Sequence, residues 1–397
     1  MVTIDKIFHA SVVLKDIIRP TPLAKAYGIA EDCALYLKPE CLQKTGSFKL
    51  RGSGYKIAML SDEEKAKGVI ACSAGNHAQG VALAASKCGI SSLICLPDTA
   101  PISKVEATKG YGAQVCLVPG VYDDAYNKAL ELKEEHGYTF VHPFDDEYVI
   151  AGQGTIGLEI MNEMSDVDAV LVPIGGGGLI SGVACAIKSI SPHVKVYGVQ
   201  AAGAPSMYNA IHHGKMEALS SVSTIADGIA VKKPGELTYE MVKNYVDDIA
   251  LVTEDEIAAA ILALIEKQKM IAEGAGAVSV AAAMFHKFPL EGKKVVSLIS
   301  GGNIDVTSLS RVIDRGLMKS GRTTSLLIEL ADKPGQLMEV SRIIAQCGGN
   351  VISVHHERNG ETESINGCYL RLSLETRNYD HVQQITQALR DAGFKIV

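Results

Sequence analysis

The feature that most constrains the fold of this chain is a regular alternation of short β-branched runs with longer helical stretches, which begins near residue 66. Strands are predicted at 69–72, 93–97 and 114–119, and a helical pattern follows each of them. Strands that alternate with helices in this way pair in parallel and bury one side of each helix against the sheet. We therefore expect an α/β fold with helices on both faces of a parallel sheet.

The alternation resumes after residue 160. Strands are predicted at 168–174, 194–200 and 293–300, and a long helix is predicted over 253–269. Thr253 stands three residues before Glu256, which is the spacing of an N-terminal capping box. The α/β pattern therefore covers most of the chain up to residue 300.

Around residues 316–324 the pattern changes to strand, helix, strand, strand, helix, strand. The predicted elements are 324–330, 339–349, 351–358, 368–376, 381–393 and 394–397. Together with the turn Asp-Lys-Pro-Gly-Gln-Leu at 332–337, this βαββαβ order resembles the ACT domain, a ferredoxin-like regulatory module that binds amino acids. We expect a catalytic domain over 1–318 and an ACT regulatory domain over 322–397.

An effector site is expected in this tail. The turn at 332–337 opens a helix, so its backbone N–H groups would meet the carboxylate of an amino-acid ligand. Asn350 begins the next strand and would bond the same ligand. The expected effector-binding residues are Asp332, Gly335, Gln336, Leu337 and Asn350.

Composition excludes several function classes. The net charge is −7, no tryptophan is present and aromatic residues make up 5%, so nucleic acid is not an expected partner. The nine cysteines are scattered and form no C-x-x-C pair, so their spacing predicts neither disulfides nor a zinc site and fits a reducing cytoplasm. Because no apolar stretch is long enough for a signal peptide or a membrane span, we expect no membrane partner.

Three segments whose residues are suited to catalysis or ligand binding lie beyond strand ends, which is where ligands bind in open α/β sheets. The segment 44–49 places Lys49 directly after Phe48, and a desolvated amine of this kind suits Schiff-base chemistry. The segment 73–77, Ser-Ala-Gly-Asn-His, opens a helix and could bind an anion. The four glycines at 175–178 follow a strand and could wrap a phosphate. Taken singly, the first segment is better explained by an ordinary surface lysine. The second is explained equally well by an N-cap turn without a ligand.

One further segment, rich in glycine, matches a cofactor-binding motif but lacks the structural context of that motif. Residues 152–157, Gly-Gln-Gly-Thr-Ile-Gly, match the dinucleotide fingerprint, but no hydrophobic strand precedes them. Asp166 and Asp168 also stand before the next strand rather than at its end. These glycines predict close helix packing rather than nicotinamide binding.

In order along the chain, KTGSFK, SAGNHAQG, GGGGL and Ser300-Gly-Gly-Asn303 resemble the fold-type II pyridoxal-phosphate enzymes of the threonine dehydratase and serine racemase branch. The similarity runs from about residue 18 to 315 and implies two parallel-sheet subdomains. It implies that Lys49 carries pyridoxal 5'-phosphate, with Phe48 against the ring and Asn76 at its phenolic oxygen. It also implies that Gly175, Gly176, Gly177, Gly178 and Leu179 hold the phosphate and that Ser300 faces the pyridine nitrogen.

The hydroxyl at Ser300 favours elimination. A neutral partner leaves the ring a weaker electron sink than a carboxylate would, which suits a reaction that discharges the Cα charge at once by losing the β-hydroxyl. Lys49 would then remove the Cα proton of L-threonine, and the released enamine would hydrolyse to 2-oxobutyrate and ammonia. Ser73, Asn76 and His77 would lie at the substrate carboxylate, with the loop around Gly228 on the far side. Lys49, Ser73 and His77 are the expected catalytic residues.

Position 74 distinguishes the two branches, because a racemase needs a proton donor on the face opposite the lysine and Ala74 has none. The divalent-metal carboxylates of the racemase branch would fall near Gln200 and Ser206, so no metal is expected. The pairs His212-His213 and His355-His356 are expected to be solvated, because adjacent side chains diverge.

Other functions stay open. A serine racemase, a β-replacement enzyme of the cysteine-synthase type and a non-enzymatic amino-acid sensor are the alternatives, although the joint retention of Lys49, Asn76 and Ser300 disfavours the sensor. L-serine would react where L-threonine reacts, yielding pyruvate, because one methyl group is worth only ~1–3 kcal/mol. The family resemblance implies a homotetramer.

Overall fold

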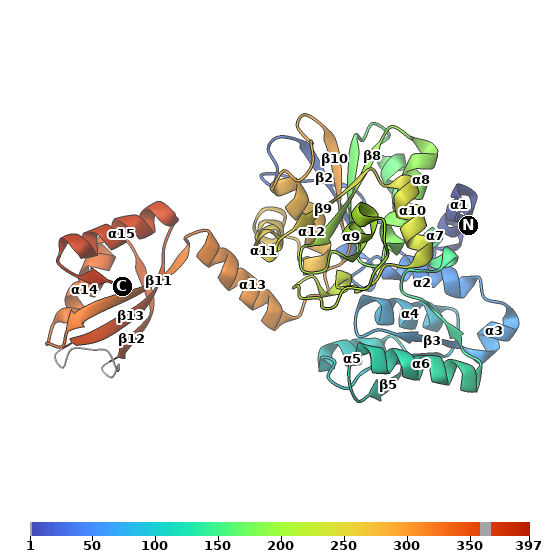
Figure 1. Ribbon diagram of the computed structural model, residues 1–397, viewed down its shortest axis with the longest axis horizontal. Helices are drawn as coiled ribbons and strands as arrows, with labels where there is room; N and C mark the ends of the chain where they lie inside the picture. Colours follow the sequence, from blue (N-terminus) through green and yellow to red (C-terminus); the bar gives the residue numbers. More distant parts are fainter. Residues whose placement is uncertain (1, 358–366) are drawn as a thin grey trace. The chain divides into compact units, whose positions relative to one another are not determined.

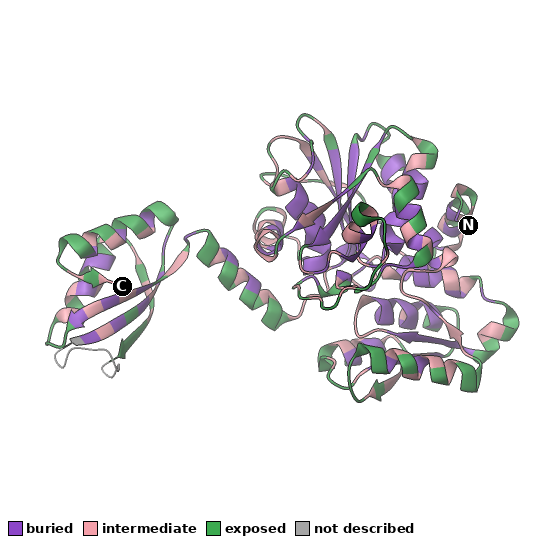
Figure 2. Cartoon of the chain, viewed as in Figure 1, coloured by how far each residue is buried: buried purple, intermediate pink, exposed green. Residues whose placement is uncertain are grey.

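The chain folds into two compact units in a computed structural model that describes residues 2–357 and 367–397. One unit ends at Ile304 and the other begins at Asp305 (Figure 1). Each has hydrophobic clusters of its own, and the buried residues concentrate on the strands and the inner faces of the helices (Figure 2).

The first unit contains two sheets, as the predicted α/β class requires. The larger sheet has six strands in the order β1-β2-β10-β7-β8-β9, and all neighbours pair in parallel except the short strand β1. Its strands are β1 (Ala24–Lys25), β2 (Ala34–Pro39), β7 (Ala169–Pro173), β8 (Lys195–Ala201), β9 (Asp248–Val252) and β10 (Lys294–Ile299).

The smaller sheet has four parallel strands in the order β5-β4-β3-β6. They are β3 (Val69–Cys72), β4 (Ser92–Pro97), β5 (Gln114–Val118) and β6 (Thr139–Phe140). Strands β3 and β7 are buried at every position, which explains why both read as unbroken apolar runs rather than as alternating patterns.

Helices surround both sheets. Those of the first unit are α1 (Ile4–Val13), α2 (Lys49–Ala58), α3 (Asp62–Lys67), α4 (Asn76–Lys87), α5 (Ile102–Gly110), α6 (Tyr122–His136), α7 (Glu147–Glu163), α8 (Gly178–Ile190), α9 (Ser206–His213), α10 (Glu236–Tyr245), α11 (Glu254–Ala263) and α12 (Gly274–Met284), with short turns η1 (Glu40–Leu42), η2 (Asp227–Ile229) and η3 (Leu264–Gln268). No helix in the described part of the chain is long and apolar enough to cross a membrane.

The capping box at the start of α11 is confirmed. The Thr253 hydroxyl accepts a hydrogen bond from the backbone of Glu256, and the Glu256 carboxylate accepts one from the backbone of Thr253. The helix is shorter than the prediction of 253–269, however. After Ala263 the hydrogen bonding becomes π-helical, and Lys269 ends the segment with a positive φ of 58°.

The glycines at 152–157 lie inside helix α7, where they permit close packing as predicted. A Cβ on Gly152 would lie 2.5 Å from the backbone oxygen of Arg51, and a Cβ on Gly157 would lie 2.8 Å from that of Val183. Helices α2 and α8 therefore approach α7 almost backbone to backbone. This leaves no room for a dinucleotide at these glycines.

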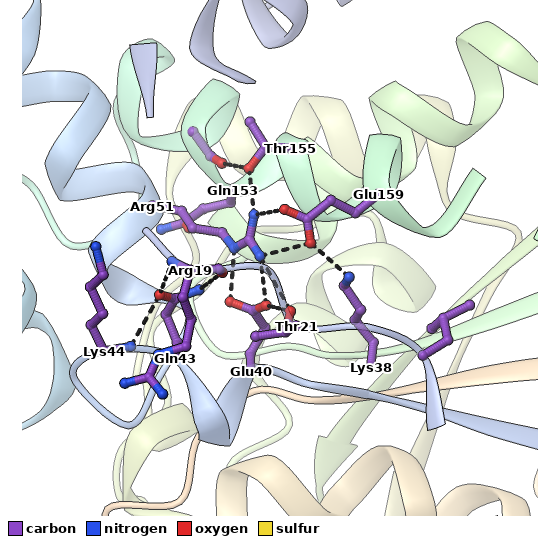
Figure 3. Close-up of polar contacts among 12 residues, drawn as sticks. Arg19, Thr21, Lys38, Glu40, Gln43, Lys44, Arg51, Gln153, Thr155 and Glu159 are labelled. Atoms are coloured by element: carbon purple, nitrogen blue, oxygen red, sulfur yellow. Dashed lines mark hydrogen bonds and ion pairs between the residues drawn. The ribbon is translucent and has the colours of Figure 1, made fainter. Parts of the chain in front are cut away.

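A buried ion-pair network anchors α2 against α7 and the end of β2. The Arg51 guanidinium, fully buried, lies 2.8 Å from a Glu40 oxygen and 2.6 Å from a Glu159 oxygen, and Lys38 contacts the second oxygen of Glu159 at 2.6 Å (Figure 3). The Thr155 hydroxyl completes the shell around the guanidinium. Each buried charge therefore has a partner of opposite sign, which offsets its desolvation.

The second unit has the predicted βαββαβ order. Its antiparallel sheet runs β12-β13-β11-β14 and packs on two helices. The elements are β11 (Thr323–Ala331), α14 (Gln336–Cys347), β12 (Asn350–Glu357), β13 (Gly367–Glu375), α15 (Tyr379–Asp391) and β14 (Lys395–Ile396). Arg358, the last residue of the predicted strand 351–358, lies outside the described residues.

The division between the units falls before helix α13 (Val306–Lys319), whereas the sequence placed the domain boundary after it, at 318–322. Helix α13 buries only Val312 and Gly316 and packs against β11. A helix with so little buried surface contributes little to a domain core, so its sequence pattern alone does not reveal the unit to which it belongs.

Candidate active site

A cavity of about 700 Å³ lies in the first unit where strands of both sheets end. The structure brings to its wall every catalytic, cofactor and substrate residue that the sequence predicted, although they are spread over some 250 positions of the chain. These residues are Phe48, Lys49, Ser73, Asn76, His77, Gly175, Gly176, Gly177, Gly178, Leu179, Gly228 and Ser300.

Lys49 begins helix α2 and projects its amine into the cavity. The Nζ atom donates a hydrogen bond to the Pro143 carbonyl at 2.8 Å and lies 5.2 Å from the centre of the Phe48 ring. Desolvation lowers the pKa of Lys49 to about 8, against an opposing attraction from Glu273. A substantial fraction of this amine is therefore neutral and nucleophilic near physiological pH.

The glycine run 175–178 links β7 to α8 in a conformation that only glycine fits. Gly177 has a φ of 98°, and a Cβ on Gly176 would lie 2.4 Å from the Phe144 ring. The loop is held by the Thr238 hydroxyl, which donates to the Gly176 carbonyl at 2.6 Å. Its N–H groups and the N-terminus of α8 form a cradle suited to a phosphate.

The segment 73–77 connects β3 to α4. The Ser73 hydroxyl accepts a hydrogen bond from the Gly75 backbone at 3.2 Å and so shapes the turn. His77 is buried, and its Nε2 donates to the Val141 carbonyl at 2.8 Å. Desolvation, together with repulsion from Lys49, lowers the pKa of His77 to about 3, so the imidazole stays neutral. A neutral histidine suits a role in binding more than one in donating protons.

Ser300 directly follows β10 and sits beside Phe48, whose backbone N–H donates to the Ser300 carbonyl at 3.0 Å. The buried Ser300 hydroxyl donates a hydrogen bond to the Ala275 carbonyl at 3.2 Å. This bond between the motif after β10 and the motif before α2 explains how two distant segments share one wall of the cavity.

Glu273 is a cavity residue that the sequence analysis did not assign to the site. The residue is 4% exposed, and its carboxylate accepts a hydrogen bond from the Asn76 amide at 2.7 Å. Burial, with repulsion from Asp227, raises the pKa of Glu273 to about 7. The sequence does contain an indication of this role, because Glu273 is the only charged residue in the small apolar tract 272–284.

Asn303 and Lys104 were also missed. The Asn303 amide donates at 2.7 Å to the Asn76 side-chain oxygen, which fixes the orientation of Asn76. At the cavity wall, Lys104 lies 3.0 Å from the Asp227 carboxylate, so an ion pair joins α5 to the loop that contains Gly228. Each contact spans more than 100 residues of sequence, which no local pattern reveals.

The predicted effector residues gather only in part. A second cavity, of about 290 Å³ and within the second unit, is lined by Asp332, Gly335, Gln336 and Leu337. Asn350 does not line it. The Asn350 side chain instead donates to Glu375 at 3.2 Å at the other end of β12.

The positions compared with the racemase metal site are occupied by Gln200 and Ser206, both buried. The Gln200 side chain donates to the Ile174 carbonyl and accepts from the Tyr208 backbone, so both ends of its amide are in use. Both members of each paired histidine, at 212–213 and 355–356, are exposed as expected.

Comparison with known sequences identifies a family and close relatives. The family described as pyridoxal-phosphate dependent enzyme matches residues 14–301. An L-threonine ammonia-lyase of Thermotoga maritima is 51% identical over 398 residues, covering 100% of this chain and 99% of the relative.

Solved structures agree with this comparison. The processed form of threonine deaminase isoform 2 from Solanum lycopersicum is 39% identical with a TM-score of 0.75, covering 79% of this chain and 89% of that one. Maize serine racemase is 36% identical with a TM-score of 0.75, covering 80% and 98%. Elimination and racemisation enzymes therefore share this architecture.

Proposed function

Because this chain belongs to the family of pyridoxal-phosphate-dependent enzymes, we propose that it is a threonine ammonia-lyase, which converts L-threonine to 2-oxobutyrate and ammonia. L-serine would be converted to pyruvate in the same way. The observation that carries the proposal is the full-length match to an L-threonine ammonia-lyase, combined with an alanine at position 74 of the cavity wall.

The cavity residues fit pyridoxal 5'-phosphate. Lys49 would hold its carbonyl carbon, the glycine loop with Leu179 its phosphate, and Ser300 its ring nitrogen. The fit rests on the cradle at 175–178, where a Cβ on Gly176, Gly177 or Gly178 would lie 2.4–2.7 Å from a neighbouring atom, and on a lysine whose pKa is lowered to about 8. When bound, this cofactor supplies an electron sink for charge that develops at the substrate Cα.

The residues of the chain supply the proton chemistry. The neutral fraction of the Lys49 amine is the base that takes the Cα proton, since its Nζ atom lies in the cavity, 5.2 Å from the centre of the Phe48 ring. Ser73, Asn76 and the backbone N–H of His77 orient the substrate carboxylate at the start of α4, where the helix dipole favours an anion, while the neutral His77 imidazole donates to the Val141 carbonyl. Ser300 would present a neutral hydroxyl, rather than a carboxylate, to the ring nitrogen. The ring is then a weaker electron sink, which favours prompt loss of the β-hydroxyl.

The direct test is a product assay with L-threonine, run with and without a thiol acceptor. We expect 2-oxobutyrate and ammonia in equal amounts, and no change when the thiol is added. Formation of a thioether amino acid would assign the chain to β-replacement, and absence of any product from the cofactor-loaded protein would favour the amino-acid sensor.

A second test addresses racemisation. Replacing Ala74 by serine adds a hydroxyl, and with it a proton donor, to the cavity wall, so Ala74→Ser should form D-serine from L-serine while the share of elimination falls. Chiral chromatography of the amino-acid pool measures this. Folded, cofactor-loaded A74S that forms no D-serine would refute the assignment of position 74 as the residue that distinguishes the branches.

For the second unit, the proposal is an ACT-type regulatory domain that binds an amino acid at the turn 332–337. Support comes from the βαββαβ order and from the cavity that Asp332, Gly335, Gln336 and Leu337 line at the start of α14. Branched-chain amino acids should change the affinity of the full-length enzyme for threonine, as calorimetry and initial rates would measure.

The control for regulation is a chain that ends near residue 320. It should still bind the cofactor and deaminate threonine, and its affinity for threonine should not respond to any amino acid. Identical binding and rates in both forms would reduce the second unit to an oligomerisation element. A homotetramer in the cytoplasm completes the proposal, and its cytoplasmic part is supported by nine cysteines that form no disulfide.

A further inference from the structure

The second unit contains a group of three potential metal ligands that the sequence analysis did not connect. We propose that Asp332, His356 and Cys368 form a binding site for a thiophilic divalent cation of the Zn²⁺ type. One ligand atom from each side chain lies within 4.8 Å of the other two, and His356 Nε2 is 3.0 Å from Cys368 Sγ. No other group of this kind occurs among residues 2–357 and 367–397.

The sheet explains why these residues meet. Strands β12, β13 and β11 are neighbours, and each brings one ligand to the same end of the sheet. His356 pairs with Leu370 across β12 and β13, so it shares a face with Cys368, two residues before Leu370. Cys368 pairs with Leu330 of β11, and Asp332 follows that strand directly. The three positions are therefore fixed by strand register.

The surroundings suit a cation site with an open position. The three side chains line the cavity of about 290 Å³, together with the apolar side chains of Leu330 and Leu370. Cys368 is only 2% exposed, whereas His356 and Asp332 are exposed and can adjust. Three protein ligands leave the fourth tetrahedral position to water or to the amino acid proposed above for this same cavity.

The donor set selects the metal class. A thiolate, an imidazole and a carboxylate are the ligands that Zn²⁺ takes in proteins, whereas Mg²⁺ and Ca²⁺ prefer oxygen alone. Zn–S and Zn–N bonds of ordinary length place S and N about 3.6 Å apart in a tetrahedral site, so His356 needs to move by only about half an ångström. On binding, the bond from Cys368 Sγ to the metal forms and the thiol proton passes to the buffer.

The absence of a sequence signal has a physical explanation. Zinc sites are found in sequences by short spacings such as C-x-x-C, whereas these three ligands stand at 332, 356 and 368, two on separate strands and one just after a third. His355 is a natural comparison, because it points to the opposite face of β12, beside Arg371. Cys347 is another, as a free thiol of the same unit outside the cluster.

The test is a Co²⁺ titration of the full-length, cofactor-loaded protein after treatment with a chelator, without oxygen. Tetrahedral Co²⁺ with a thiolate ligand gives intense visible bands at longer wavelength than the cofactor, so the readout does not depend on activity. We expect one Co²⁺ per chain, displaced by one Zn²⁺. His356→Gln and Cys368→Ser should weaken binding by at least ~10-fold, while His355→Gln and Cys347→Ser should leave it unchanged.

Two results would overturn the proposal. One is a wild-type protein whose Co²⁺ spectrum stays that of the hydrated ion. The other is equal loss of affinity in H355Q and H356Q, which would place the metal elsewhere. Because Cys368 is buried, C368S could fail to fold. The exposed His356→Gln, checked by its thermal transition without metal, then decides the question.

Discussion

Lys49 and Arg51 stand two residues apart on helix α2, yet the fold gives them opposite electrostatic environments. Arg51 is enclosed by the carboxylates of Glu40 and Glu159, which outweigh its desolvation and hold its pKa above the ordinary value (Figure 3). Lys49 donates to a neutral carbonyl, and no ion pair joins it to a carboxylate in the described chain. Its pKa falls to about 8.

The difference teaches how one helix can both anchor the fold and supply chemistry. A buried cation with matched carboxylates stays charged and is inert, because losing its proton would leave the carboxylates unpaired. A buried amine without such partners loses charge easily and becomes a base and nucleophile. The packed side of α2 carries the first kind of group, and its cavity side carries the second.

The largest expected effect is the loss of Lys49. Lys49→Ala should remove the visible absorbance of lysine-bound cofactor and lower threonine turnover by at least ~10³-fold, because the base is gone. Lys44→Ala is the matched control, since Lys44 lies in the same motif but donates to the Ile17 carbonyl outside the cavity. Retention of the absorbance in purified K49A, without added amine, would mean that another lysine carries the cofactor.

Breaking the Arg51 network should affect stability rather than chemistry. Arg51→Met leaves Glu40 buried without its partner, so we expect the free energy of unfolding to fall by roughly 3–5 kcal/mol. Urea unfolding measures this. Lys109→Met breaks an exposed pair with Glu106 and should cost less than about 1 kcal/mol. If both substitutions cost the same, burial does not decide the strength of these pairs.

Glu273 extends the comparison of buried charged groups, because its titration should make the stability of the protein depend on pH. Its pKa in the folded protein, about 7, lies above the ordinary 4.5, so the folded state binds the proton more tightly and stability falls as pH rises between these values. Glu273→Gln keeps an acceptor for Asn76 and does not titrate. As the pH rises from 4.5 to 7, the free energy of unfolding of the variant should therefore rise relative to that of wild type, by at most about 3 kcal/mol. Urea unfolding midpoints across that range measure this difference. His77 contributes equally to both proteins and cancels.

A constant difference between E273Q and wild type over this range would show that the Glu273 carboxyl does not titrate there. Glu106→Gln is the control, because this exposed carboxylate does not line the cavity and makes its ion pair with Lys109.

The smallest expected effect is at the cavity wall. Lys104 and Asp227 form an ion pair in which the Asp227 carboxylate is well exposed, so Lys104→Met should change the free energy of unfolding by less than about 1 kcal/mol. Salt should reduce the difference further, as thermal melts at low and high ionic strength would reveal. A loss as large as that of Arg51→Met would contradict the role that we assign to burial.

The sequence predicted much of the site because its motifs are local. The loops 73–77 and 175–178 follow strands whose apolar runs are readable, and each opens a helix with small or capping residues. Their meeting in one cavity does not follow from the rule that parallel strands share a carboxyl edge, because β3 and β7 belong to different sheets and only tertiary packing brings those sheets together. The sequence could not predict that Asn350 would lie away from the cavity lined by Gln336, because the position along β12 depends on strand pairing.

What the sequence determined by itself is the order of strands and helices, the glycine loop and the lysine motif, all of which arise from periodicity and local backbone preference. Only the tertiary structure decided that Glu273 faces Asn76 and that Asp332, His356 and Cys368 come together. It also decided that Lys49 loses charge while Arg51 keeps it. The reason is physical: a pKa or a ligand set depends on burial and on partners from distant segments, and neither quantity is encoded in any short stretch of chain.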